Sequence, residues 1–261
     1  MPPSLTTSLP DVRRLEAVSF RSWPATRTRF DGTWAIRLTA GHPAKRLNSV
    51  NALDPADHVN LEQRILNAQQ IFQDFGRPLI FRQSPLAPPE LDNILDARGW
   101  LRFDETRVMT LPVSEEFQRL SKQPIITTDI GHWIDQSIEM GSFNASIKPG
   151  MFELINAVEG QVALFLDETV DSKPNAAALA VRFHDQVGIF ELVSNPGNRK
   201  RGFGIKIMHE CMAWAQIVGA SRRWLQVVTE NEAANRLSAK VRFTDAYRYI
   251  YRPAPGVNHA Q

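Results

Sequence analysis

The chain has 261 residues, of which 43% are hydrophobic and 22% charged, and its net charge is +2. These proportions are typical of a globular protein and exclude disorder for most of the chain. The apolar runs are short, as at 176–181, so we expect neither a membrane span nor an export signal. One cysteine, Cys211, cannot form an intramolecular disulfide, which favours a cytoplasmic location.

The charges are unevenly distributed along the chain. Residues 1–50 contain eight Arg or Lys against three Asp or Glu, whereas residues 153–171 contain five acidic residues and no basic ones. The first segment could attract an anionic ligand and the second a cationic substrate, or both could be solvated surface. The basic residues follow no zinc-finger or helix-turn-helix pattern, so we predict no nucleic acid partner.

Hydrophobic periodicity and turn residues predict interleaved helices and strands, which indicates a mixed α/β fold. In the first half we expect strands at 33–39, 46–53, 78–83 and 105–111, and helices at 56–75 and 88–98. In the second half we expect strands at 160–167, 176–184, 187–195, 223–229 and 246–252, and helices at 129–140, 202–218 and 231–240. Polar residues at 113–124 predict a domain boundary there.

Two segments of the chain are similar to each other at an offset of 143 residues. Residues 91–100 and 234–243 each form a short amphipathic pattern that ends at an aromatic residue, Trp100 and Phe243, and a predicted strand follows in both cases. This similarity is expected either from an internal repeat or by chance between two short helices.

The segment with the clearest chemical signal is 188–204. An apolar strand is followed by Pro196, which cannot donate to a ladder, so we expect the strand to part from its neighbour there. Gly202 and Gly204 then begin a helix whose first N–H groups are unshielded, and these groups favour a pyrophosphate. Arg199, Lys200 and Arg201 add positive charge beside them.

Two other phosphate-binding patterns do not match this loop. The Gly-x4-Gly-Lys-Ser/Thr loop is absent, and the dinucleotide pattern Gly-x-Gly-x-x-Gly lacks its third glycine at position 207. Gly202-x-Gly204 alone is also compatible with a tight strand-to-helix turn that binds no ligand.

The residues around this loop resemble the GNAT N-acetyltransferase superfamily. Pro196, Arg199, Gly202 and Gly204 fit the family's Pro-x-x-Arg-x-x-Gly-x-Gly/Ala loop, and a second family motif is matched by Asn231, Ala234, Leu237 and Phe243. The resemblance implies a mixed, mostly antiparallel sheet flanked by helices. It is strong over 180–252, and it suggests a degenerate GNAT-like domain at 1–115 before a cofactor-binding domain at 120–261.

The resemblance implies acetyl-CoA as co-substrate and direct transfer of its acetyl group to a primary amine of a small molecule or peptide. A non-catalytic acyl-CoA sensor or scaffold is the alternative. Residues implied in cofactor binding are Leu192, Val193, Ser194, Arg199, Lys200, Arg201, Gly202, Phe203, Gly204 and Asn231. We expect the acceptor pocket to be formed by residues 30–53 and 140–160.

The resemblance also points to candidate catalytic residues, with two departures from the family pattern. Ser238 stands where the family usually has a proton-donating tyrosine, and Arg242 replaces the usual glycine before Phe243. Glu191 interrupts an apolar strand and is our candidate general base, unless it faces solvent or pairs with an arginine. Glu153 is a second candidate.

Three tyrosines lie on the last predicted strand, 246–252. Tyr247, Tyr249 and Tyr251 share one face of this strand and could form an apolar wall or supply a proton donor. The six histidines show no ligand spacing, so we predict no metal. A homodimer is possible on this sequence, and nothing in it predicts a membrane partner.

Overall fold

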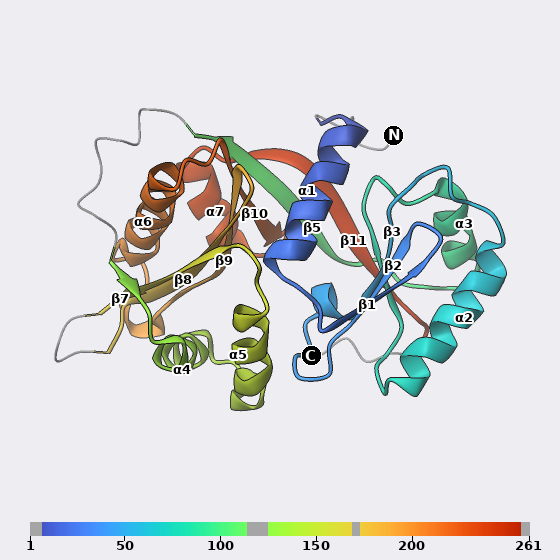
Figure 1. Cartoon of the computed structure of the whole chain (residues 1–261), viewed down its shortest axis with the longest axis horizontal. Coiled ribbons are helices and arrows are strands. Elements are labelled where there is room, and N and C mark those ends of the chain that lie inside the picture. Colours follow the sequence, from blue (N-terminus) through green and yellow to red (C-terminus); the bar gives the residue numbers. More distant parts are fainter. Residues whose placement is uncertain (1–6, 114–124, 169–172, 257–261) are drawn as a thin grey trace.

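The computed structural model describes residues 7–113, 125–168 and 173–256 (Figure 1). The helices are α1 (Leu9–Ser22), α2 (Leu61–Asp74), α3 (Pro89–Ala97), α4 (Ile130–Gly141), α5 (Lys148–Asn156), α6 (Phe203–Ile217) and α7 (Glu232–Lys240). The strands are β1 (Arg27–Asp31), β2 (Trp34–Leu38), β3 (Ser49–Ala52), β4 (Ile80–Gln83), β5 (Phe103–Pro112), β6 (Ile126–Thr127), β7 (Gln161–Asp167), β8 (Ala176–Phe183), β9 (Gln186–Ser194), β10 (Arg222–Val228) and β11 (Thr244–Pro253). No helix in these ranges is long and apolar enough to cross a membrane.

All described strands form one sheet, in the order β1-β2-β3-β4-β11-β5-β10-β9-β8-β7-β6. Only β3 with β4 and β9 with β10 run parallel among the described pairs, so the prediction of a mixed, mostly antiparallel sheet flanked by helices is confirmed. The predicted boundary at 113–124 falls almost wholly outside the described residues. The division into two domains therefore stays a prediction.

The last strand of each half of the chain lies in the other half of the sheet. β5 pairs with β10 over 106–112, and β11 pairs with β4 over 250–253. The two strands also pair with each other, from Thr244 opposite Thr110 to Tyr251 opposite Phe103. Each half of the sheet is therefore completed by a strand from the other half of the chain.

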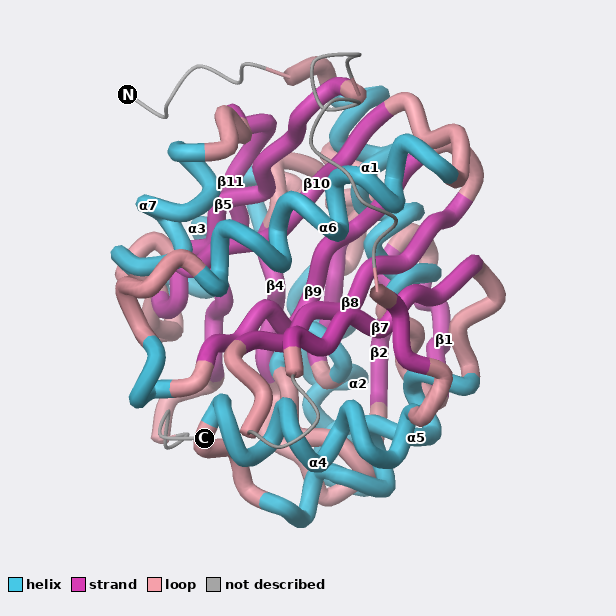
Figure 2. Tube along the Cα trace, turned by 90° about the vertical axis from the view of Figure 1, so that its left-hand side faces the viewer, coloured by secondary structure: helices cyan, strands magenta, loops and turns pink. Residues whose placement is uncertain are grey.

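Helices cover both faces of the sheet and define three apolar clusters. α6 and α7 pack on one face of β7–β10, and α4, α5 and α1 pack on the other. Figure 2 shows β7 to β9 between α6 on one side and α4 on the other. α2 and α3 cover the sheet formed by β2, β3 and β4.

The similarity between 91–100 and 234–243 corresponds to one backbone motif used twice. Trp100 N–H donates to the Leu95 carbonyl and Phe243 N–H to the Ser238 carbonyl, both at 3.0 Å. The preceding residues, Gly99 and Arg242, are both left-handed, with φ of 71° and 66°. These bonds end the helix with a left-handed residue in both copies, so Arg242 adopts the conformation that favours glycine.

Four elements were not predicted from the sequence: α1, β1, α5 and the short β6. α1 begins at a Ser8 cap with a proline in its first turn, and Val12, Leu15 and Val18 bury one face of it. The helix expected at 56–75 begins later, because Asn60 is left-handed (φ 54°) and Asp57 is bound to Thr33 and Arg64.

A buried charged network ties α1 to the centre of the sheet. The carboxylate of Glu16 accepts from both Nη atoms of Arg82, at 2.6 and 2.9 Å, and from Tyr247 Oη at 2.6 Å. Burial lowers the pKa of Arg82, but the Glu16 carboxylate and the neighbouring Tyr249 and Tyr247 together outweigh burial and raise this pKa well above its ordinary value. Burial, together with the same carboxylate, raises the pKa of Tyr247 well above its usual range, so the phenol remains a donor.

We expect Glu16→Gln to lower the free energy of unfolding by about 3 kcal/mol or more, because it leaves the buried Arg82 guanidinium without a counter-charge. Denaturant unfolding measures this difference. The control is Glu232→Gln, which removes the exposed pair with Arg236 and should leave stability nearly unchanged. Equal effects of the two variants would contradict the role of Glu16.

Candidate active site

β9 and β10 pair in parallel only at the start of the two strands. The register runs from Arg222 opposite Gln186 to Leu225 opposite Ile189 and then stops. Beyond that point β9 still pairs with β8, and β10 still pairs with β5 as far as Val228 opposite Thr106. This strand therefore parts from its neighbour as predicted, but it does so after Ile189 and not at Pro196, which follows the end of β9. The facing backbone edges from Phe190 and from Gln226 onward are not paired with each other.

Aromatic side chains pack against the strands where they part. Phe190 stacks on Trp23 at 5.1 Å between ring centroids and meets Trp224 edge-on at 5.2 Å. Gly188 allows this packing, because a Cβ atom there would lie 2.6 Å from the Trp224 ring. Gln226 donates to Ser19 of α1 at 3.0 Å, so α1 contacts β10 just beyond the point where the strands part.

The chain leaves β9 through the loop that the sequence analysis singled out. Pro196–Asn198 form a short 3-10 turn, and α6 begins after Gly202, which has φ 91° and supplies no side-chain cap. Arg199, Lys200 and Arg201 are exposed. No side chain in the described structure caps the first N–H groups of α6, and three exposed basic residues directly precede them in the chain.

Glu191 lies at a bulge of β9. The β8–β9 register shifts between Ala177 and Leu179, and Glu191 is left-handed with φ 47°. In a regular strand, the neighbouring side chains of Phe190 and Glu191 would point to different faces of the sheet. The bulge instead brings both side chains beside Arg46. The Arg46 guanidinium donates to Glu191 Oε1 and lies 4.5 Å from the Trp23 ring centroid. Glu191 therefore pairs with an arginine, which was the alternative to a free general base.

Arg46 reaches Glu191 from the other half of the chain, through the segment 41–47. This segment is held against α5, because Gly41 and Gly150 meet so closely that a Cβ on Gly150 would lie 2.0 Å from the Gly41 carbonyl oxygen. The expected acceptor segments, 30–53 and 140–160, therefore meet at this point. Glu153 is exposed on α5 beside Gly41.

His42 lies in the same segment and is almost fully buried. Its Nδ1 accepts from the Ala44 N–H at 3.2 Å, which leaves the proton of the neutral ring on Nε2. Burial lowers the pKa of His42, although the Glu191 carboxylate opposes this. His42 is therefore a neutral hydrogen-bond donor at pH 7.

The remaining residues singled out from the sequence have structural partners. Ser238 is buried and its hydroxyl donates to the Asn235 carbonyl at 3.0 Å. The Asn231 side chain caps α7, because its Oδ1 accepts a hydrogen bond from the Ala234 N–H at 3.0 Å. Leu192 and Val193 pack into the clusters on opposite faces of the sheet, and Phe203, the first residue of α6, packs against the cluster that this helix covers. Ser194 is half-buried opposite Ala176.

The three tyrosines of β11 lie on one buried face, as predicted, and belong to one apolar cluster. Tyr249 Oη donates to Gln226 Oε1 at 3.0 Å, and Tyr247 donates to Glu16. Burial raises the pKa of Tyr251 well above its usual range. These side chains form a wall, and the hydroxyls of Tyr247 and Tyr249 have acceptors on α1 and β10.

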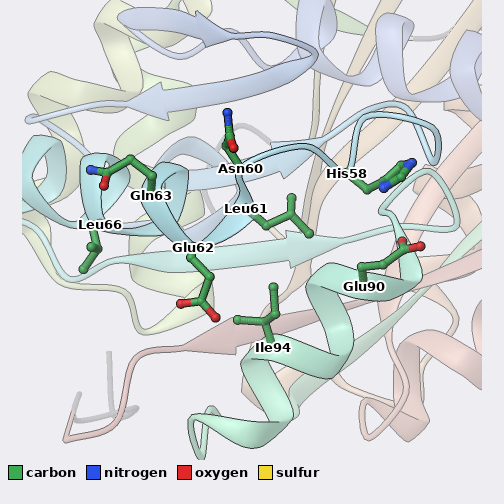
Figure 3. Close-up of a pocket in the computed structure, with 8 residues that line it drawn as sticks. All are labelled: His58, Asn60, Leu61, Glu62, Gln63, Leu66, Glu90 and Ile94. Atoms are coloured by element: carbon green, nitrogen blue, oxygen red, sulfur yellow. The ribbon is translucent and has the colours of Figure 1, made fainter.

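A groove of about 500 Å³ lies in the first half of the chain, at the start of α2 and beside α3 (Figure 3). Its place at the start of α2 corresponds to the start of α6 in the second half. Asn60 precedes α2 with φ 54°, as Gly202 precedes α6. The lining includes two carboxylates and no Lys or Arg, which disfavours a diphosphate. The lining residues are His58, Asn60, Leu61, Glu62, Gln63, Leu66, Glu90 and Ile94.

The described residues contain no group of three or more His, Cys, Asp or Glu side chains that could hold a metal ion. Cys211 is fully buried on α6, as its position on the apolar face predicts. No spacing in the sequence connects Arg46 with Glu191, which are 145 residues apart, and this pair was not anticipated as a unit.

The parted strand, the uncapped helix that follows it and the mixed sheet define a GNAT-type acetyltransferase fold. A solved GCN5-related N-acetyltransferase from Kribbella flavida matches with a TM-score of 0.68 at 14% identity, over 95% of this chain and 97% of that one. A tandem GNAT protein from the clavulanic acid biosynthesis pathway matches with a TM-score of 0.62 at 12% identity, over 98% and 91% of the two chains.

Sequence comparison places the chain more narrowly. The family model described as "Probable histone acetyltransferase Rv0428c C-terminal" matches residues 9–252, and the chain belongs to this family within the GNAT N-acetyltransferase superfamily. The uncharacterized N-acetyltransferase YobR of Bacillus subtilis (strain 168) is 28% identical over 250 residues, which are 93% of this chain and 98% of that protein.

We expect Gly150→Ala to lower stability by about 1–3 kcal/mol, because the added methyl group overlaps the Gly41 carbonyl and neither backbone can yield without strain. Thermal and denaturant unfolding measure this effect. Gly131→Ala is the matched helical control, since a Cβ there meets only Asp129 Oδ1, at 3.5 Å. A Gly150→Ala variant as stable as the control would contradict the close contact.

Burial raises the pKa of the Cys211 thiol well above its ordinary value, so little reactive thiolate forms at neutral pH. We expect iodoacetamide to leave the native protein unmodified and to add one group after denaturation. Mass spectrometry of the intact chain counts the adducts. Rapid labelling of the native protein at pH 7 would show that the thiol is accessible.

Proposed function

We propose that this protein transfers the acetyl group of acetyl-CoA directly to a primary amine. The observation that carries the proposal is the combination of a β9 edge that has left β10 with an uncapped, glycine-lined start of α6 directly after it. The membership of the GNAT superfamily supports the acetyltransferase class.

The start of α6 has the features that a diphosphate needs. Its first N–H groups have no helical acceptor, and the positive end of the helix dipole lies there. Side chains do not obstruct this surface, because a Cβ on Gly202 would meet only Ile205, at 3.9 Å, and one on Gly204 only Leu237, at 3.8 Å. Arg199 and Lys200 supply exposed positive charge at the same place.

The unpaired edge of β9 suits the chain between the diphosphate and the acetyl group. The backbone groups of β9 point alternately to β8 and to the open edge, and Asn195 N–H donates to Asn175 on the β8 side. By this alternation Val193 faces β8, whereas the N–H and C=O groups of Leu192 and Ser194 can hydrogen-bond an extended amide-containing arm as a neighbouring strand would. An N–H of this edge directed at the thioester oxygen stabilises the charge that develops there, by about 3 kcal/mol in comparable sites.

The bound thioester would supply an activated acetyl carbon. The amine nitrogen forms the new C–N bond while the C–S bond breaks, so an ammonium acceptor yields the amide, the free thiol and one proton. In this proposal Glu191 takes a proton from the incoming ammonium group. Ser238 donates to a backbone carbonyl within α7, so we assign the proton of the departing thiolate to water, which suffices for a thiol of pKa about 8.5.

A second candidate is an acyl-CoA sensor that binds without turnover. Two observations favour it: the buried Ser238 replaces the usual tyrosine, and Glu191 is paired with Arg46. Release of CoA from acetyl-CoA in the presence of a panel of amines separates the two functions. Acetyl-CoA binding without turnover of any amine would favour the sensor.

We expect Gly202→Asp to weaken acetyl-CoA binding at least tenfold, because a carboxylate then occupies the positive end of α6. Isothermal titration calorimetry measures the affinity. Gly76→Asp is the matched control, since Gly76 is also left-handed (φ 70°) with nothing within 4 Å of its Cβ position, but lies after α2. Unchanged affinity in Gly202→Asp would remove this site from the proposal.

A further inference from the structure

The pair of Arg46 and Glu191 is the point at which the two halves of the chain meet beside the parted strand. The side chains are 25% and 16% exposed, so both are largely desolvated and still reachable from solvent. Arg46 is also fixed by its ring contact with Trp23. The proposed base is therefore not available alone: an acceptor that approaches Glu191 also meets the guanidinium of Arg46.

A ligand that separates this pair must replace both partners. A simple ammonium group can take the place of Arg46 on Glu191, but it leaves the guanidinium largely buried without a counter-charge, which is unfavourable. A ligand with both an ammonium and a carboxylate group can pair with both residues at once. Because Arg46 and Glu191 are in direct contact, the two charges of such a ligand must lie close together, as they do in a free α-amino acid.

The charge around Arg46 independently favours an added anion. Arg37 is 3% exposed, and its guanidinium donates to the backbone carbonyls of Arg46 and Trp23. No carboxylate is ion-paired with Arg37 in the ranges that the structure describes. Burial first, and the nearby Arg82 second, lower the pKa of Arg37 to about 9.

The other charged groups near this pair do not cancel the surplus. Glu16 is committed to Arg82, and Lys45 is paired with Asp104 at 2.6 Å. Arg77 donates to the Ala40 carbonyl at 2.6 Å, and Glu153 on α5 is exposed. The neutral His42 has its Nε2 proton available. The described residues between the two halves therefore carry more positive than negative charge.

We infer that the acceptor is a free α-amino acid, whose carboxylate binds Arg46 and whose ammonium group binds Glu191. This inference rests on the proposed acetyltransferase function and adds a substrate class to it. Arg46, from the first half of the chain, then determines specificity: a guanidinium binds a carboxylate through two parallel hydrogen bonds, and an acceptor without that group leaves it unpaired. The product is an N-acetyl amino acid.

The test compares α-amino acids with their carboxamides as acceptors, since each pair differs only in the carboxylate. A lysine peptide with blocked termini and a simple alkylamine complete the panel. We expect kcat/KM of the wild-type enzyme to be at least tenfold higher for the preferred amino acid than for its carboxamide, with the peptide and alkylamine as poor as the carboxamide.

The variant that tests Arg46 is Arg46→Met, which keeps an unbranched side chain against Trp23 but removes the charge. We expect it to bring the ratio of kcat/KM for acid over carboxamide close to one while the acetyl-CoA affinity is unchanged. Arg46→Lys, with a charge but no fork, should give an intermediate ratio. Arg13→Met, which removes an exposed arginine paired with Asp54, should keep the wild-type ratio.

The outcomes separate this inference from the function beneath it. Equal turnover of acid and carboxamide, preferential turnover of the lysine peptide, or an unchanged ratio in a folded Arg46→Met variant would overturn the amino acid acceptor and leave the acetyltransferase standing. Acetyl-CoA binding without turnover of any acceptor would overturn the proposed reaction, and this inference with it. Melting temperatures of all variants establish that they are folded.

Discussion

The pairing of β5 with β11 at the centre of the sheet is the constraint on which the geometry of the site depends. β5 holds β10 along its whole length, so β10 remains in the sheet after β9 has left it. β11 carries the tyrosine wall on which α1 rests, and Tyr247 joins the Glu16–Arg82 pair. The same exchange brings the segment 41–47 beside β9. The site is therefore assembled from both halves of the chain by one pair of strands.

The site is also where local rules of structure are broken. Glu191 takes a left-handed conformation inside a strand, and the polar atoms Trp23 Nε1, Trp224 Nε1 and Ser22 Oγ are buried without a hydrogen-bond partner among the described residues. Such positions cost free energy and persist where the surrounding packing fixes them. Here the stacked rings of Trp23 and Phe190 and the Glu16 network provide that packing.

Local signals in the sequence identified the features that neighbouring residues determine. Pro196 and Gly202 predicted the end of the strand and the start of α6, and the segment at 234–243 predicted α7 with its aromatic end, because turn and helix-end chemistry act within a few residues. α1 has the same kind of signal in its Ser8 cap and apolar period. No helix was predicted from the sequence over these residues.

Features that join distant residues could not be found in this way. Strict alternation would place the Glu191 side chain on the face of the sheet that Phe190 does not occupy. The bulge brings Glu191 to Arg46, and no recognised sequence pattern predicts this bulge. The exchange of β5 and β11 depends on which edges are free after the helices have packed. Both are outcomes of tertiary pairing between segments more than a hundred residues apart.

The position of β11 also constrains how the polypeptide acquires its shape during translation. β4 has β11 as its neighbour, so the first half of the sheet cannot close until residues 244–253 have left the ribosome. β4 and β5 have edges that are free until their partners arrive, and contacts of such long sequence separation form slowly. An emerging chain of this kind depends on protection of those edges, by a chaperone or by rapid synthesis of the remainder, more than a chain whose halves fold independently.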